Sequence, residues 1–264
     1  MNLLLQSMKL ILAIVWTSIS FNLYSLPIEA QTNTPRPKPR INNASSKKQF
    51  QSRGIPPLPK GAGPRNPCSA MEAGVTALMP VTVEPSKTPG KSSEYWGGYT
   101  TQGHPTFWFY VPYAPKNIQP GTSIFTLFNR KNLTEYKANL VITGTPGIVS
   151  VSLPNEVEIK PGEWYESQLF LKVSCDNKFA PQTDFASGWV RRDSLITPIK
   201  PNSTTQQQLE IYLKDEMWFD ALGILAEMKR ENTKNQLWDE TLKSIGLETI
   251  AGKRIVNCCT TRNQ

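Results

Sequence analysis

The strongest constraint on the fold is a long series of short apolar runs between Ala73 and Asp193. Each run is rich in Val, Ile, Thr, Phe, Tyr or Trp, and each is closed by Pro, Gly or Asn. Short runs of this composition with frequent turn signals are typical of strands in an antiparallel sandwich or barrel. The predicted strands are Val75–Met79, Thr106–Val111, Ser123–Phe128, Lys137–Thr143, Ile148–Leu153, Tyr165–Ser174 and Ala186–Arg192.

Proline and glycine define the ends of several runs. The run Thr106–Val111 is apolar on both alternating faces and lies between Pro105 and Pro112, which indicates a central strand covered on both sides. The segments 144–147 and 160–163 place Pro and Gly as tight turns require, so we expect each to close a hairpin.

Beyond Pro201 the apolar spacing becomes helical. Residues 203–206 resemble a capping box that opens a first helix. Met217–Arg230 places Trp218 and Leu222 on one face, and a third helix over Leu237–Ile245 ends at a glycine. The fold class predicted from these patterns is α+β: an antiparallel β-sandwich, immunoglobulin-like by preference, followed by a short C-terminal helical hairpin.

The N-terminus has the features of a secretory signal peptide. One positive charge, Lys9, precedes an apolar stretch, and the small residue Ala30 precedes a candidate cleavage site before Gln31. The stretch is shorter than the about 20 apolar residues that a membrane span needs. We expect export to the periplasm or the extracellular space, with an uncleaved N-terminal anchor as the alternative.

The formal net charge of +8 comes from a single segment. Residues 31–66 contain eight basic residues, no acidic residue and many prolines, whereas residues 67–264 contain equal numbers of basic and acidic side chains. Such a segment predicts a disordered tether, either a solubilising spacer or a contact for an anionic surface such as polysaccharide or cell wall. Export makes nucleic acid an unsuitable target.

Five parts of the chain follow from these patterns. We expect a signal peptide, a basic Pro-rich tether, a β-sandwich domain, a helical tail and a disordered end. Their predicted bounds are 1–30, 31–66, 67–200, 201–250 and 251–264.

Several strings resemble a known family. They run from residue 106 to 113, from 144 to 154, from 171 to 176 and from 188 to 191, with a closing stretch over 216–222. These strings are similar to a cyanobacterial family of exported proteins, domain of unknown function 928 (DUF928), over roughly Cys68 to Ile250. The resemblance implies a host and a compartment but no activity. The tail over Gln207–Gly246 is also weakly similar to a tetratricopeptide hairpin, and one repeat must lean on the β domain or on a partner.

The sequence contains no motif of a catalytic, cofactor or metal site. The only histidine, His104, lies in a Gly-rich loop with no nucleophile or acid at a motif spacing. The acidic residues Glu156, Glu158, Glu163 and Glu166 fit a solvated hairpin edge better than the facing carboxylates of a glycosidase. We therefore expect no enzyme and no cofactor, with a cryptic hydrolase as a minor alternative.

Two groups of residues are candidates for binding. Tyr95, Trp96 and Tyr99 lie among glycines and polar residues in a predicted loop, and they suit sugar rings or peptides if exposed. In the competing interpretation they fold back over the strand edge. Trp218 and Leu222 are expected to pack on the β domain or on a partner. These features predict a non-enzymatic interaction or scaffold protein of the cell envelope, with a glycan-binding module as the alternative.

Four cysteines in an oxidising compartment permit three fully paired connectivities, and sequence alone does not choose among them. A bond between Cys258 and Cys259 would strain the intervening peptide. A bridge from Cys68 to Cys175 would pin the N-terminal edge to the sheet, and two buried free thiols are the alternative.

Overall fold

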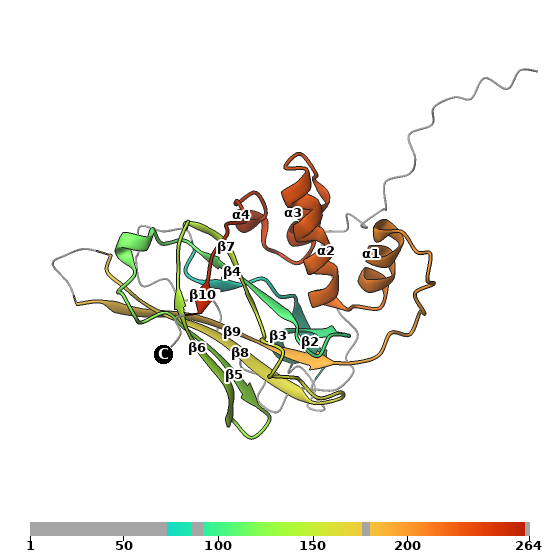
Figure 1. The fold of residues 1–264 in the computed structure, drawn as a ribbon, viewed down its shortest axis with the longest axis horizontal. Coiled ribbons are helices and arrows are strands. Elements are labelled where there is room, and N and C mark those ends of the chain that lie inside the picture. The colour runs from blue at the N-terminus through green and yellow to red at the C-terminus, as the bar shows by residue number, and fades with distance from the viewer. Residues whose placement is uncertain (1–72, 86–91, 176–179, 262–264) are drawn as a thin grey trace, which may run out of the picture. The chain divides into compact units, whose positions relative to one another are not determined.

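Strand β4 is packed between the second sheet and the helices. The structure is a computed structural model that describes residues 73–85, 92–175 and 180–261. The neighbours of β4 are β1 and β7 in a sheet of order β1-β4-β7, and the other strands form a sheet of order β10-β6-β5-β8-β9-β3-β2 (Figure 1). The strands are β1 (Thr76–Ala77), β2 (Val81–Pro85), β3 (Ser92–Thr100), β4 (Thr106–Val111), β5 (Ile124–Asn129), β6 (Thr134–Val141), β7 (Gly147–Ser152), β8 (Trp164–Val173), β9 (Gln182–Arg192) and β10 (Thr260–Thr261).

The side chains of β4 alternate between two interfaces, as a centrally buried strand requires. Phe107 and Phe109 point toward the other sheet, where their ring centroids lie 5.2 and 6.3 Å from that of Phe125. The ring of Trp108 packs instead at 5.8 Å against Trp238 of a helix. The prediction of a strand covered on both sides is confirmed.

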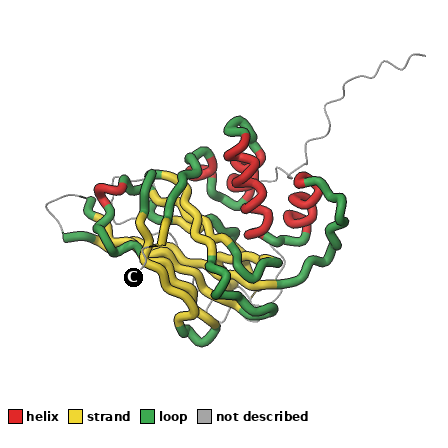
Figure 2. The backbone as a smooth tube through the Cα atoms, in the orientation of Figure 1, coloured by secondary structure: helices red, strands yellow, loops and turns green. Residues whose placement is uncertain are grey.

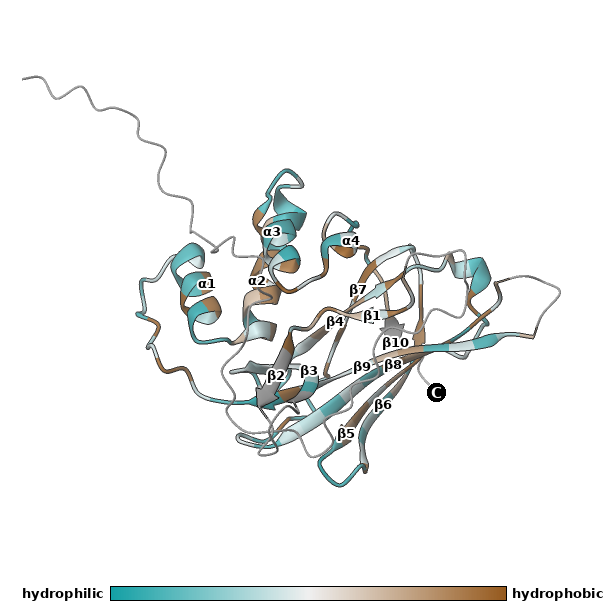
Figure 3. Ribbon diagram, turned by 180° about the vertical axis from the view of Figure 1, so that it is seen from behind, coloured by the Kyte–Doolittle hydropathy of each residue, from teal (hydrophilic) through white to brown (hydrophobic). Residues whose placement is uncertain are grey.

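Four helices follow β9 and lie together on one side of the strands (Figures 1 and 2). They are α1 (Thr205–Lys214), α2 (Trp218–Glu231), α3 (Leu237–Ser244) and α4 (Glu248–Ala251), and a short 3-10 helix, η1 (Pro115–Asn117), precedes β5. In Figure 3 hydrophilic colour predominates on α1 and α3, whereas hydrophobic segments run along β4 and β7. The predicted α+β class with mostly antiparallel sheets is confirmed, and the C-terminal segment contains more than one hairpin.

The helices and sheets share a core. Trp218, Leu222 and Leu225 of α2 are buried in the same apolar cluster as Phe107 of β4 and Leu169 of β8. All described residues belong to one unit, Ile41–Gln264, and the other unit, Met1–Arg40, lies outside them. The helical tail is therefore part of the β domain's core.

The capping box of α1 is present one residue later than predicted. Thr204 is the N-cap, and its hydroxyl accepts a hydrogen bond from the backbone N–H of Gln207 at 3.2 Å. The Gln207 side chain in turn accepts from the N–H of Thr204 at 2.9 Å. This reciprocal pair satisfies two backbone donors at the helix start.

Neither of the two predicted hairpin turns closes a hairpin. The turn at 160–163 has Gly162 at a φ of 76° and leads into β8, but residues 157–159 before it form no strand, and β8 pairs with β5 and β9. The turn at 144–147 was expected to close a hairpin, but β6 and β7 lie in different sheets. That prediction was wrong because the turn chemistry specifies a reversal and does not specify which strand becomes the neighbour.

The chain end joins the two sheets at this same turn. The guanidinium of Arg254 donates to the carbonyl oxygens of Gly144 and Pro146 at 2.6 and 3.3 Å. The backbone of residues 254–256 bonds to Ile148 of β7, and β10 pairs with β6. The expectation of a disordered end over 251–264 was wrong for residues 251–261.

Candidate ligand pocket

The aromatic residues Tyr95, Trp96 and Tyr99 lie in strand β3 and not in an exposed loop. Tyr95 and Tyr99 are each 2% exposed, and their rings pack 5.9 and 5.7 Å from that of Trp164. The predicted exposed platform is wrong, and the competing interpretation, in which the aromatics close over the sheet, describes them.

The glycines of β3 explain why this strand resembles a loop in sequence. A Cβ on Gly97 would lie 2.6 Å from the carbonyl oxygen of Trp189, and a Cβ on Gly98 would lie 2.7 Å from Trp218 Cβ. Both glycines therefore permit a close approach, of β9 on one side and of α2 on the other. The sequence alone cannot distinguish this use of a Gly pair from a flexible loop.

Trp218 and Leu222 are buried within the chain, with 3% and 1% exposure. The indole nitrogen Nε1 of Trp218 donates to the carbonyl oxygen of Leu78 at 2.8 Å. The prediction that they pack on the β domain is confirmed, and they are not available as a surface for an external partner.

The four glutamates of the predicted hairpin edge do not form a catalytic pair. Glu158 forms an ion pair with Arg192, and Glu156 and Glu163 are exposed. Burial raises the pKa of Glu166, although a hydrogen bond with Ser187 opposes this shift. A partly buried acid of this kind is a structural partner of its strand neighbour.

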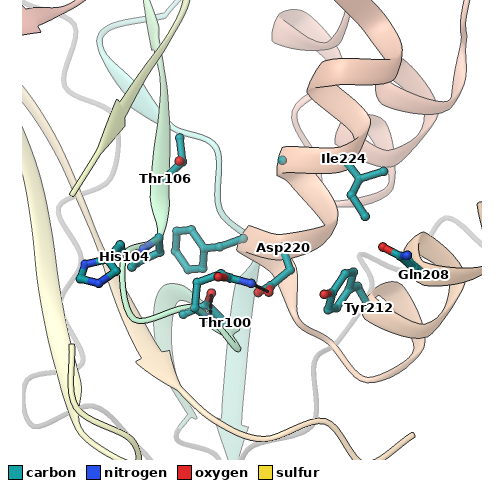
Figure 4. A pocket seen from close by; sticks show the side chains of 11 residues that line it. Thr100, His104, Thr106, Gln208, Tyr212, Asp220 and Ile224 are labelled. Carbon is teal, nitrogen blue, oxygen red and sulfur yellow. Dashed lines mark hydrogen bonds between the residues drawn. The ribbon is translucent and has the colours of Figure 1, made fainter. Parts of the chain in front are cut away.

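His104 supports a loop. Its Nδ1 lies 3.0 Å from the carbonyl oxygen of Val157. Because a carbonyl oxygen only accepts, Nδ1 must carry the proton, so the neutral ring has its acceptor at Nε2. Figure 4 shows the ring turned away from Asp220 and Tyr212.

A pocket of about 380 Å³ lies where the β3–β4 loop meets α1 and α2. We call it the junction pocket. Its lining includes Gln102, Gln208, Tyr212, Phe219, Asp220 and Gly223, together with His104 and Ile224 at its margins (Figure 4). A volume of this size is at the lower end of the about 300–1,000 Å³ that small-molecule sites occupy.

Asp220 connects helix α2 to the loop after β3. Its Oδ2 accepts from the backbone N–H of Thr101 at 3.0 Å, and its Oδ1 accepts from the hydroxyl of the same residue. The amide of Gln102 approaches Oδ1 at 3.4 Å. This carboxylate thus positions the loop, and it is the only carboxylate among the described residues that line the junction pocket.

Two aromatic side chains, Phe219 and Tyr212, line the junction pocket. Phe219 packs 5.4 Å from the ring of Phe107. Burial raises the pKa of Tyr212, the negative charge of Asp220 raises it further, and a hydrogen bond with Thr101 opposes both. The Tyr212 hydroxyl therefore stays protonated at neutral pH.

Two negative findings concern the described residues. No group of three His, Cys, Asp or Glu side chains over 73–85, 92–175 and 180–261 could hold a metal ion. Within those same residues no helix is both long and apolar enough to cross a membrane.

The cysteines are only partly covered by the structure. Cys258 is bonded to Cys259, the adjacent pairing that the sequence disfavours. Cys175 is also disulfide-bonded. Cys68 lies outside the described residues, so the bridge from Cys68 to Cys175 stays a prediction.

The junction pocket was not found by sequence reasoning. Its lining comes from one loop and two helices, and no motif links Gln102 to Gln208 or Tyr212. One local signal was available: Gly223 lies inside a helix, where glycine is unfavourable.

The comparisons with known proteins add a family assignment. The sequence model described as Domain of Unknown Function (DUF928) matches residues 60–255. The chain belongs to the DUF928 family. No curated protein and no solved structure matches it significantly. The DUF928 match includes all four helices and every described strand except β10. The junction pocket therefore lies within the family's domain.

Proposed function

We propose that this DUF928 protein is an exported, non-enzymatic binding protein of the cell envelope. The observation that carries the proposal is the chemistry of the junction pocket. It offers hydrogen-bonding side chains around a partly apolar cavity, and the Asp220 carboxylate in its lining is held by Thr101. We do not propose a hydrolase, because a glycosidase needs two carboxylates at the scissile bond.

Export is supported by the sequence of residues 1–30, which lies outside the described residues. The experiment is to fractionate the native host and to sequence the N-terminus of the mature protein. We expect an envelope or secreted protein that begins at Gln31. A full-length protein recovered in the cytosol would overturn this part of the proposal.

The proposal includes two classes of partner. One is an envelope protein with tetratricopeptide-like helices, in a cyanobacterial host, which the weak similarity of the helical tail suggests. The other is an anionic polysaccharide or cell wall that contacts the basic segment 31–66. Binding by the basic segment should weaken as the salt concentration rises, because interactions of exposed charges are screened over about 8–10 Å at physiological ionic strength.

A retention assay on envelope extracts separates the two. The full mature chain is immobilised beside a variant in which every Lys and Arg of residues 31–66 is replaced by Gln. Polysaccharide retained only by the unmodified chain, and released by salt, indicates the basic segment. Protein retained equally by both chains indicates the folded part, and no specific retention by either chain would contradict the binding function.

A further inference from the structure

Gly223 is in the interior of helix α2, where glycine costs about 1 kcal/mol relative to alanine. The usual structural reasons for a helical glycine do not apply to it. A Cβ built on Gly223 meets no atom within 4 Å, so no neighbouring backbone requires its absence. Gly223 is also not one of the described glycines with a positive φ. What Gly223 does provide is open space in the junction pocket, which it lines.

Three side chains of the lining have acceptor positions left for a ligand. The Gln102 amide nitrogen is occupied by Thr101 Oγ1 and Asp220 Oδ1, and the Gln208 amide nitrogen donates to the carbonyl oxygen of Ser203 at 3.1 Å. Both amides therefore have their carbonyl oxygens left for a ligand. A carboxylate has about four acceptor positions, and three donors approach that of Asp220. A ligand that fits this set must supply several donors.

Charge narrows the class of ligand. Among the described residues no Lys or Arg lines the pocket, so a phosphate or carboxylate would lack the cation that such groups need. An ammonium ion is disfavoured too, because donors from Thr101 and Gln102 already surround the Asp220 carboxylate. A neutral ligand with several hydroxyl groups satisfies the acceptors without burying an uncompensated charge.

The apolar side chains of the lining also suit a sugar. Phe219 and Ile224 contribute apolar side chains to the lining, and Ile224 lies near the polar side chain of Gln208 (Figure 4). A sugar ring combines the same two kinds of surface, with a C–H face and a rim of hydroxyls. An aromatic or aliphatic wall beside a few placed polar groups is the usual composition of such sites.

We propose that the junction pocket binds a neutral sugar, either free or as the end residue of a glycan, and that Gly223 keeps the pocket open for it. This proposal rests on the binding function proposed above, and it moves glycan recognition from the buried residues Tyr95 and Tyr99 to the junction of loop and helices.

Filling the pocket tests the proposal. Gly223→Leu places a side chain into the open space and improves helix propensity, so the fold is retained. Gly252→Leu is the matched control, because a Cβ on Gly252 also meets no atom within 4 Å but Gly252 does not line the pocket. Gln208→Ala removes one acceptor as a second, independent variant.

Binding is measured by titration calorimetry and by ligand-observed NMR on the full mature chain. The probes are glucose, galactose, N-acetylglucosamine and their β1,4-linked oligomers, with tetramethylammonium and inorganic phosphate as charged probes. We expect at least one neutral sugar to bind, with affinity unchanged in Gly252→Leu and lowered at least tenfold in Gly223→Leu. A free-sugar site binds the monomer as well as the oligomer, whereas a glycan-end site favours the oligomer.

Three outcomes would overturn the proposal: no neutral sugar binds, only a charged probe binds, or Gly223→Leu binds as well as the unmodified chain. None of these bears on export or on the retention of envelope partners, which the fractionation and retention assays measure. A failure of the sugar site is thus distinguishable from a failure of the proposed function.

Discussion

Asp184 is a buried carboxylate that joins three parts of the fold. It is 0% exposed, and its Oδ2 accepts from the backbone N–H of Val75 at 2.8 Å and from the Tyr113 hydroxyl at 2.6 Å. Burial raises the pKa of Asp184, while the hydrogen bonds from Tyr113, Val75 and Phe185 offset part of the shift. The residue therefore contributes a pH-dependent component to stability.

The sign of this component follows from the direction of the shift. Because the folded state holds the proton more tightly than the unfolded state, the contribution is full below the ordinary Asp pKa of about 3.9. It is lost as the pH rises through the raised pKa of the folded state. Asp184→Asn stays neutral at every pH. We therefore expect its unfolding free energy to change less with pH than that of the unmodified protein.

Urea unfolding from pH 4 to pH 8 measures this effect. The unfolding free energy of the unmodified protein minus that of Asp184→Asn should decrease as the pH rises. Glu166, whose pKa burial also raises, is present in both proteins and cancels. Parallel curves across this range would contradict the assignment.

Gly223 lies within α2 and Gly98 packs against it, and alanine is expected to have opposite effects at the two positions. Gly223→Ala should raise the unfolding free energy by about 0.5–1 kcal/mol, because it improves helix propensity and meets open space. Gly98→Ala should lower it, because the new Cβ would lie 2.7 Å from Trp218 Cβ. The urea midpoints of the two variants check this, and a loss of stability in Gly223→Ala would show that the helix needs glycine there.

Helix α2 is the element that attaches the helical segment to the sheets. It has contacts with β3 and β4 of the sheets and with the helices α1 and α3. Leu222→Ala should destabilise the whole protein by about 2–5 kcal/mol, because Leu222 is 1% exposed in the shared core.

Glu231→Ala, at the exposed end of the same helix, is the control and should change stability by less than about 0.5 kcal/mol. Both variants are compared by thermal and urea unfolding. If Leu222→Ala were as stable as Glu231→Ala, the helical segment would not depend on its contact with the sheets.

At the scale of the whole molecule, the last residues hold the two sheets together. Residues 254–256 bond to Ile148 of the three-stranded sheet, and β10 pairs with β6 of the seven-stranded sheet. Val256 is 7% exposed, and its Cγ1 would lie 2.7 Å from a Cβ on Gly147.

We expect a chain that ends at Lys253 to remain folded with a lower urea midpoint. The control is Lys253→Ala in the full-length chain, since Lys253 is exposed. Equal midpoints would show that the C-terminal contacts add no stability. Loss of cooperative unfolding would show that they are needed for the two sheets to form one core.

The sequence by itself predicts the elements whose signals are local. Pro105 and Pro112 bound a strand that could be read directly, and the period of residues 217–230 predicts a helix with Trp218 and Leu222 on its buried face. Backbone restrictions and hydrophobic period act over a few residues, so these features do not depend on the rest of the chain.

Only the tertiary structure decided which distant segments meet. The parallel pairing of β3 with β9 turned the Gly97-Gly98 segment from an apparent loop into a buried strand, and it removed Tyr95 and Tyr99 from the surface. The junction pocket likewise depends on the docking of α2 beside Thr101, 119 residues earlier in the chain than Asp220. Such contacts depend on complementary surfaces that form only when both segments are folded, so no short stretch of sequence carries their signal.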